Sequence, residues 1–235
     1  MSGPINYNWR RSLRAKTLQV RITPWQGVEV VIPRHTSKER VRAFLTRHRN
    51  WIRDTWQRIR AQVPDIEQCL PEALDLRAIG ERWQVRYQRR PGERVRVTTG
   101  RGRVITVFHD GRSESAVRRA LRRWLAAKAR GILKLRLDRL CRLTGIGYKN
   151  LQIRGQRSRW GSCSSNKTLS LNYKLLFLEP PLVRYLIIHE LSHMRVLDHS
   201  TRFWNVVAQH EPHWKRLDAE LGESWRDIPA WVEMP

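Results

Sequence analysis

The chain has 235 residues, of which 40% are hydrophobic, so it is long and apolar enough to enclose a core and does not have the composition of a disordered chain. It has no apolar run of about 18 residues, so we expect neither a membrane-spanning helix nor a membrane partner. No apolar segment follows its first charges, so we expect a cytoplasmic protein. Its three cysteines are far apart and odd in number, which argues against a disulfide framework and a cysteine-rich zinc finger.

Positive charge is concentrated in the first two thirds of the chain. The formal net charge is +25. Residues 151–235 hold 11 basic and 9 acidic side chains, which leaves residues 1–150 with 35 basic and 12 acidic ones, a net charge of +23. Such a charge favours polyanions, although a solvated basic face explains it equally well. Nucleic acid is therefore a candidate partner of the basic N-terminal part.

Residues 1–110 are predicted to be rich in β-structure with one long helix. Thr36 and Glu39 have the spacing of a capping box, and apolar residues then recur at helical spacing to about residue 62. Segments of alternating apolar and polar residues, separated by glycine- and proline-containing turns, predict strands. These strands are 18–24, 27–33, 82–88, 94–100 and 103–109.

A long basic helix is predicted from about residue 113 to 143. Regularly spaced leucines give it one apolar face and arginines crowd the remainder, so it is the best candidate for a polyanion-binding surface. Against this role, no aromatic residues interleave with the arginines and no helix-turn-helix pattern appears. Strands joined by a tight turn at 165–167 are expected next, with alternation continuing through LSLNYKLLF (169–177). Pro180 then starts a helix, because proline is tolerated in a first turn.

The helix that starts at Pro180 carries the sequence HELSH at residues 189–193. Residues four apart lie on the same helix face, so His189 and His193 can share one cation. Glu190 leaves the helix about 100° away, beside the metal, as in the H-E-x-x-H arrangement of zinc peptidases. Apolar residues just upstream bury the helix, and buried imidazoles without partners are poorly satisfied, which a metal corrects.

Spacing alone leaves several candidates for the third ligand of such a site. A catalytic zinc needs a third protein ligand and one position left to water. His199 leads, because it follows His193 at the offset of the third histidine in metzincins, and a tight turn brings it near the pair. Val196 stands where metzincins have glycine, so the chain must turn differently. The rival ligands are Asp198, His210, Glu211 and His213.

Three segments together resemble the YgjP-like metallopeptidase family, a zincin group related to the SprT and WLM metalloproteases. They are RSRWGSCSS (157–165), LSLNYKLLF (169–177) and PPLVRYLIIHELSHMRVLDHSTRFW (180–204). The resemblance is strongest over residues 148–221, and Asn172-Tyr173 stands where the family often has Asn-Trp. It implies a zinc-dependent peptidase acting on a peptide or protein. It also implies that His189, His193 and His199 bind Zn²⁺ and that Glu190 is the catalytic base for a metal-activated water.

The segment RWGSC has two interpretations. Arg159 and Trp160 either line a cleft whose edge strand pairs with an extended peptide, or are core and turn residues that position the metal helix; we favour the second. Cys163 is not expected to be a nucleophile, because the metal already supplies one. Candidates for stabilising an oxyanion are Arg159, Tyr173 and His213.

The predicted fold class is α+β. A basic β-rich part with one long helix is expected over residues 1–110, and a helical, zincin-like metallopeptidase part with a small β-sheet and the HExxH helix over 111–235. The two parts can pack as one compact unit. Three alternatives to a zinc metallopeptidase stay open. They are a nucleic-acid-associated protein, including a protease acting on DNA- or RNA-bound proteins, a metal-dependent hydrolase of non-peptide substrates, and a structural zinc site with four protein ligands.

Overall fold

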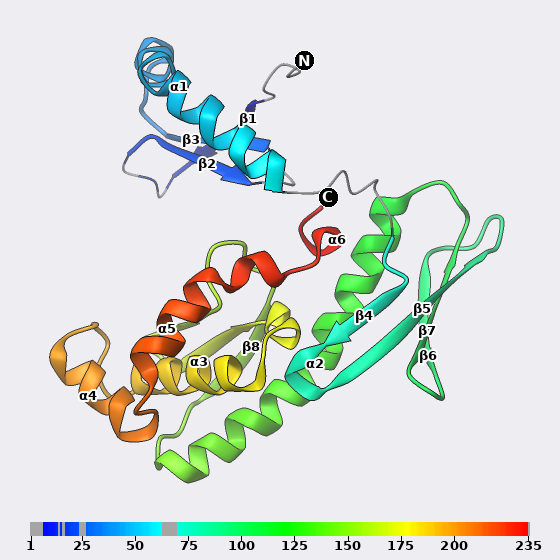
Figure 1. Cartoon of the computed structure of the whole chain (residues 1–235), viewed down its shortest axis with the longest axis vertical. Helices are drawn as coiled ribbons and strands as arrows, with labels where there is room; N and C mark the ends of the chain where they lie inside the picture. Colours follow the sequence, from blue (N-terminus) through cyan, green and yellow to red (C-terminus); the bar gives the residue numbers. More distant parts are fainter. Residues whose placement is uncertain (1–6, 14, 16, 24–26, 63–69, 235) are drawn as a thin grey trace. The chain divides into compact units, whose positions relative to one another are not determined.

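The computed structural model describes residues 7–13, 15, 17–23, 27–62 and 70–234 (Figure 1). Its contacts divide the chain into two compact units, residues 1–69 and residues 70–233. Within the described ranges, no helix is both long and apolar enough to cross a membrane.

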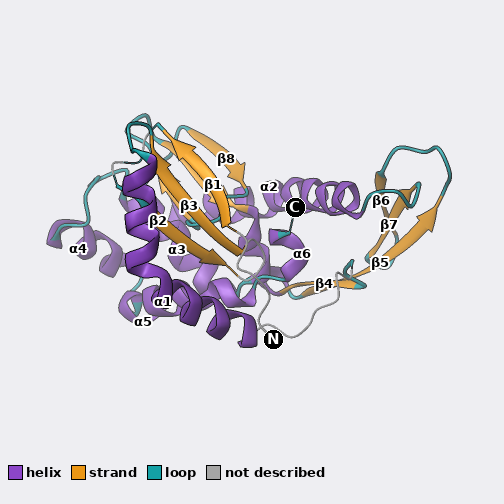
Figure 2. Cartoon of the chain, turned by 90° about the horizontal axis from the view of Figure 1, so that it is seen from above, coloured by secondary structure: helices purple, strands orange, loops and turns teal. Residues whose placement is uncertain are grey.

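The first unit consists of a three-stranded sheet and one helix (Figure 2). Its elements are β1 (Tyr7–Ser12), β2 (Gln19–Thr23), β3 (Gly27–Pro33) and α1 (Lys38–Gln62). The strand order is β1-β3-β2, with β1 parallel and β2 antiparallel to the central strand. Helix α1 contacts β2 and β3, and Val28, Val30 and Ile52 are fully buried.

The predicted hairpin and helix of this unit are confirmed, with two differences. Strand β1 was not predicted, because its sequence YNWRRS lacks regular apolar alternation. The helix cap lies one residue later than expected: the hydroxyl of Ser37, rather than that of Thr36, accepts a hydrogen bond from the backbone N–H of Arg40 at 3.2 Å. The predicted turn at residues 24–26 lies outside the described residues.

The second unit begins with a four-stranded sheet in the order β4-β5-β7-β6. The strands are β4 (Ala73–Leu76), β5 (Glu81–Arg89), β6 (Arg96–Gly100) and β7 (Val104–His109). The central pair β5 and β7 is parallel, and the outer pairs are antiparallel. The three strands predicted in this region are confirmed, whereas the short β4 was not predicted. A 3-10 turn, η1 (Arg77–Ile79), joins β4 to β5.

The long basic helix is confirmed as α2 (Glu114–Thr144). The hydroxyl of Ser113 caps its first turn by accepting from Ala116 N at 3.2 Å, and Gly145 ends it in the left-handed conformation that glycine favours. The leucine face of α2 is fully buried in the same core as side chains of β4 and β7. Residues 70–110 therefore belong with α2. The sequence suggested a boundary at 110/111, whereas the contacts divide the chain at 69/70.

A second sheet and four helices complete this unit. The strands are β8 (Asn150–Arg154), β9 (Gly161–Cys163) and β10 (Thr168–Asn172), and the helices are α3 (Pro180–Ser192), α4 (Thr201–His210), α5 (Trp214–Glu223) and α6 (Ala230–Glu233), with 3-10 turns η2 (Tyr173–Phe177) and η3 (Ser224–Asp227). The strand order is β8-β10-β9, which places β9 at an edge. Helix α3 contacts β9, α2, α4 and α5, so it lies at the centre of the unit. The α+β class predicted from the sequence is confirmed.

One strand prediction in this region was too long. Strand β10 ends at Asn172, whose side-chain oxygen accepts from Lys174 N at 3.2 Å and starts the 3-10 turn η2. All five residues of η2 are buried. Alternation cannot distinguish a strand from a tight turn when both faces of the segment are covered.

Candidate metal centre

Helix α3 places the HELSH sequence at its C-terminal end. Its residues Tyr185, Ile187 and Leu191 are fully buried, so the helix is held inside the core. His189 and His193 lie on one face, with ring centroids 5.1 Å apart. Backbone hydrogen bonds within residues 191–196 then turn the chain, which brings His199 back to the pair before α4 begins.

The three imidazole rings converge. The centroid of His199 lies 5.2 Å from that of His189 and 4.7 Å from that of His193. One nitrogen atom of each ring lies within 4.8 Å of the others, and the Nε2 atoms of His189 and His199 are 3.2 Å apart. Nitrogens bonded at 2.0–2.1 Å to a tetrahedral metal are about 3.3 Å apart. The spacing therefore fits donors around one ion.

Oxygen atoms on the outer side of two rings fix which nitrogen carries the proton. Nδ1 of His193 lies 3.1 Å from the carbonyl oxygen of Val196, which can only accept. Nδ1 of His189 lies 3.4 Å from the hydroxyl of Tyr185, and that hydroxyl donates its proton to Asp218 Oδ1 at 2.7 Å. The hydroxyl oxygen therefore accepts from His189. In both neutral rings the lone pair is then left on Nε2, the atom available to a cation.

The protonation states of the rings suit metal binding. Burial, together with the neighbouring His193 and His199, lowers the pKa of His189 to about 3. Burial is also the main cause that lowers the pKa of His193. Both rings are therefore neutral near pH 7, which is the form of imidazole that binds metal ions.

Glu190 follows His189 in α3, and its carboxyl group is buried. Its side chain is only 5% exposed, and Oε2 has no hydrogen-bond donor among the described residues. Burial raises its pKa to about 8, which the charge of Arg159 partly opposes. An unpaired carboxylate in the core is costly unless a positive charge compensates it. The three converging imidazole nitrogens fit a divalent cation, whose charge would favour the ionised form of this buried carboxyl group.

Aromatic side chains of α4 pack against the three histidines. The ring of Phe203 stacks on His193 with centroids 4.4 Å apart and meets His189 and His199 edge-on at 4.9 and 4.8 Å. Trp204 lies 5.7 and 5.8 Å from the rings of His189 and His199. These contacts restrict the rotamers of the imidazoles.

None of the rival ligands joins this cluster in the described part of the chain. Asp198 instead accepts a hydrogen bond from Ser200 N at 3.1 Å, and Glu211 pairs with Arg184. His213 lines a groove formed by α2, α3 and α5.

The residues of the RWGSC segment divide between core and site. Trp160 is a core residue, as favoured from the sequence: it stacks on Trp225 at 3.9 Å and donates to the carbonyl of Leu221 at 3.1 Å. Arg159 acts electrostatically on Glu190. Burial and the charge of Glu190 raise the pKa of the Cys163 thiol, which argues against a reactive thiolate.

Sequence reasoning missed two features of this site. The first is the Tyr185–Asp218 pair behind His189; the position of Tyr185, four residues before His189, was its one signal. The second is Gly161 of β9, which lies directly against Glu190. Nothing in its local sequence distinguishes this glycine from a turn residue.

A buried helix that presents two histidines and a glutamate, with a third histidine from the following loop, is the arrangement of HExxH metallopeptidases. The sequence model described as YgjP-like, metallopeptidase domain matches residues 16–224, and the chain belongs to this family. The resemblance noted from the sequence is thus confirmed.

Two solved structures of other proteins are similar to part of this chain. The metallopeptidase zymogen abylysin of Pyrococcus abyssi is 23% identical with a TM-score of 0.37, over 40% of this chain and 95% of that chain. The metallopeptidase zymogen jannalysin of Methanocaldococcus jannaschii is 21% identical with a TM-score of 0.36, over 40% of this chain and 96% of that chain. No curated protein matches the sequence significantly.

Proposed function

We propose that this protein is a zinc-dependent metallopeptidase in which His189, His193 and His199 bind Zn²⁺ and Glu190 is the general base. The observation that carries this proposal is the convergence of three imidazole nitrogens at the end of a helix that also holds Glu190, a buried carboxyl group whose Oε2 has no hydrogen-bond donor among the described residues. The cytoplasmic location expected from the sequence stays a prediction.

The donor set favours a catalytic zinc site. Imidazole nitrogen suits zinc among the common biological cations, whereas calcium and magnesium prefer oxygen. A structural zinc normally has four protein ligands, and a catalytic one has three. Across the described ranges, only three histidine, cysteine or acidic side chains come together here. This count supports the catalytic alternative.

The residues around the metal position would divide the work of hydrolysis. A bound divalent cation supplies Lewis acidity, which polarises a carbonyl group and makes water easier to deprotonate. Glu190 would accept the proton of the attacking water on its free Oε2 and deliver it to the leaving amine. Because burial raises the pKa of Glu190 to about 8, this carboxyl group can hold a proton near neutral pH. The positive charge of Arg159 favours its ionised form.

The position of β9 favours a peptide over a non-peptide substrate. Among the described strands, β9 pairs with β10 alone, and it contacts α3, so its second side is a sheet edge next to this helix. A free edge can pair with an extended peptide through main-chain hydrogen bonds. Since Gly161 of β9 abuts Glu190, a peptide bound along this edge would pass close to the catalytic carboxylate.

The experiment that tests this function combines metal analysis with a peptide-library digest of wild type and the Glu190→Gln variant. We expect about one zinc ion per chain in both proteins and cleavage by the wild type alone. Equal cleavage by the variant excludes Glu190 as the base, and a metal-free wild type excludes the metallopeptidase assignment.

A second candidate function is binding of single-stranded nucleic acid by the first unit. Strand β1 carries Tyr7 and Trp9 with ring centroids 5.9 Å apart, and Trp9 is 57% exposed. Exposed Arg10 and Arg11 follow directly; Arg10 pairs with Glu29 at 2.9 Å, and Arg11 forms no ion pair with the described residues. Aromatic rings that stack on bases, together with arginines that meet phosphates, are typical of single-strand binding surfaces.

Helix α2, preferred for this role from the sequence, is less suitable. Arg118 is buried and pairs with Glu114, and Arg122 donates to the carbonyl of Val232. The test of the β1 surface is fluorescence anisotropy with a labelled single-stranded oligonucleotide at several salt concentrations. We expect binding that weakens with salt and is lost in Trp9→Ala. Binding that ignores salt, or that Trp9→Ala leaves unchanged, removes this candidate.

A further inference from the structure

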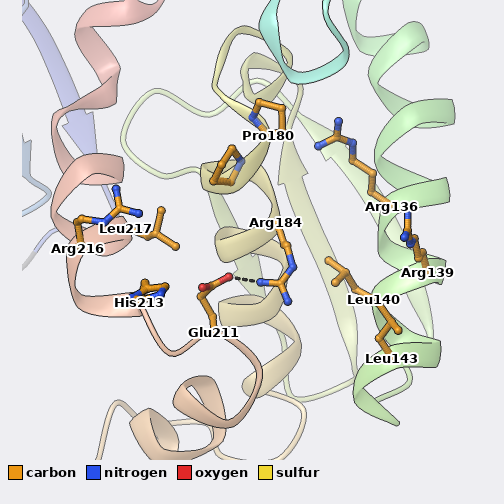
Figure 3. A pocket seen from close by; sticks show the side chains of 11 residues that line it. Arg136, Arg139, Leu140, Leu143, Pro180, Arg184, Glu211, His213, Arg216 and Leu217 are labelled. Atoms are coloured by element: carbon orange, nitrogen blue, oxygen red, sulfur yellow. Dashed lines mark hydrogen bonds and ion pairs between the residues drawn. The ribbon is translucent and has the colours of Figure 1, made fainter.

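A groove with a volume of about 610 Å³ lies between α2, α3 and α5 (Figure 3). Arg184 contributes to it from α3, five residues before His189. At 100° per residue around the helix axis, the side chain of Arg184 points about 140° away from that of His189 and about 180° away from that of His193. The groove therefore lies on the opposite face of α3 from the histidines and is separate from the candidate metal centre.

The lining of this groove is positively charged. Four arginines line it, Arg136, Arg139, Arg184 and Arg216, against the single carboxylate of Glu211. That carboxylate is buried and pairs with Arg184, as Figure 3 shows. Arg216 pairs with Glu220, which lies outside the lining, so Arg136 and Arg139 are the lining arginines that have no acidic partner among the described residues.

The arginines on the α2 side are the ones most available to a ligand. Arg136 donates to the backbone carbonyl of Ala78, which fixes its guanidinium group and leaves further N–H donors. Arg139, one turn later, is exposed and forms no ion pair or hydrogen bond with the described residues. An anion placed above α2 can therefore reach both side chains without breaking an ion pair.

Apolar side chains accompany these charges. Leu140, Leu143 and Leu217 line the groove together with two prolines at the start of α3. Leu143 is 67% exposed, so its side chain is accessible to a ligand. No Phe, Tyr or Trp is among the lining residues, and the one ring in the lining is the imidazole of His213. The groove therefore presents positive charge beside an aliphatic surface, which fits a ligand that carries both carboxylates and aliphatic groups.

We propose that this groove is a docking site for an acidic, leucine-rich segment of another protein. Carboxylates of that segment face Arg136 and Arg139, and its apolar side chains pack on Leu140 and Leu143. Charge complementarity identifies the occupant: the arginines require anions, and the aliphatic lining disfavours a nucleic acid backbone. Docking here does not depend on the proposed catalysis, because the groove and the histidines lie on opposite faces of α3.

The test uses the full-length chain and a fluorescein-labelled amphipathic peptide of Glu and Leu residues, followed by fluorescence anisotropy. The groove variant is Arg139→Glu. The matched control is Arg130→Glu, an exposed arginine on the same helix, nine residues earlier and thus about 180° around α2. Both substitutions change the net charge by the same amount, so a general attraction to a basic protein affects them equally. A third variant, Leu143→Ser, tests the apolar contact without changing any charge.

We expect Arg139→Glu to raise the Kd about tenfold or more, Arg130→Glu to change it less than about twofold, and Leu143→Ser to raise it several-fold. A peptide with Gln in place of Glu should bind at least about tenfold more weakly to the wild type. If Arg139→Glu and Arg130→Glu weaken peptide binding equally, the proposal is overturned. It is also overturned if the wild type binds the Gln peptide as tightly as the Glu peptide. A single-stranded oligonucleotide that binds with the same dependence on Arg139, while the acidic peptide does not, overturns it in favour of nucleic acid.

Discussion

A Cβ atom added to Gly161 would lie 2.6 Å from Oε1 of Glu190 and 2.8 Å from its Cγ. The edge strand β9 and helix α3 are therefore packed so closely that only glycine fits between the backbone of β9 and the carboxyl group of Glu190. The close approach fixes the side chain of Glu190 from one side, while Oε2 has no protein donor in the described part of the chain.

We predict that Gly161→Ala displaces Glu190 and lowers kcat about 100-fold, because a shift of about 1 Å in a catalytic group has an effect of that size. Zinc content should stay near that of wild type, since the histidines are not touched. Peptide hydrolysis and metal analysis on the same sample check this. Gly147→Ala is the matched control, since a Cβ there meets nothing within 4 Å. Wild-type kcat in both variants would show that this contact does not position the base.

We predict that Tyr185→Phe weakens zinc affinity about 10- to 100-fold, because it removes the hydroxyl that accepts from His189 and connects this ring to Asp218. Competition with a chromophoric chelator measures the effect. Tyr148→Phe is the control, because it removes another tyrosine–aspartate hydrogen bond, 2.8 Å to Asp138, that lies outside the histidine cluster. Equal zinc affinities in the two variants would mean that the Tyr185 hydroxyl has no influence on the metal.

A buried ion pair ties the C-terminal helix α6 to the core. Lys174 is only 1% exposed, pairs with Glu233 and donates to the carbonyl of Gln156 at 3.0 Å. We predict that Glu233→Leu lowers the free energy of unfolding by about 3–5 kcal/mol, because it leaves a buried ammonium group without its counter-charge. Urea unfolding measures this loss.

The double variant Lys174→Met with Glu233→Leu should recover part of that stability, because two apolar groups need no ion pair. Lys134→Ala, which breaks an exposed pair with Asp138, serves as the surface control and should cost less than about 1 kcal/mol. A Glu233→Leu variant as stable as this control would contradict a structural role for the buried pair.

Metal binding should stabilise the second unit. A free zinc concentration 100 times the Kd adds about 2.7 kcal/mol to the free energy of unfolding, and chelation removes it. For a unit of this size we expect Tm to fall by about 5–10 °C when zinc is removed. His193→Ala should melt at the same temperature with and without zinc. A zinc-dependent Tm in that variant would contradict the proposed ligand set.

The sequence predicted features whose cause is local. The HELSH spacing places two histidines on one helix face, and the short offset to His199 limits where the third ring can lie. Strands β2, β3, β5, β6 and β7 and helix α2 were predicted because their apolar residues alternate or recur over several positions. The segment β1 lacks such a pattern, and β4 is only four residues long, so neither was predicted.

The remaining features depend on contacts between distant residues. Gly161 and Glu190 are 29 residues apart, and Tyr185 and Asp218 are 33 apart, so no spacing rule connects them. The division of the chain at residue 69/70 depends on which core receives β4 to β7, and each strand's own pattern leaves that open. The groove on the far face of α3 depends on three helices that only the tertiary fold brings together.

The most direct test of the metal centre is a crystal structure of the zinc-loaded full-length chain with anomalous scattering recorded at the zinc edge. We predict a single strong peak about 2.0–2.1 Å from Nε2 of His189, His193 and His199, with a water as the fourth ligand and Glu190 beside it. No peak between these three rings, or a fourth protein side chain in place of the water, would contradict the catalytic zinc centre.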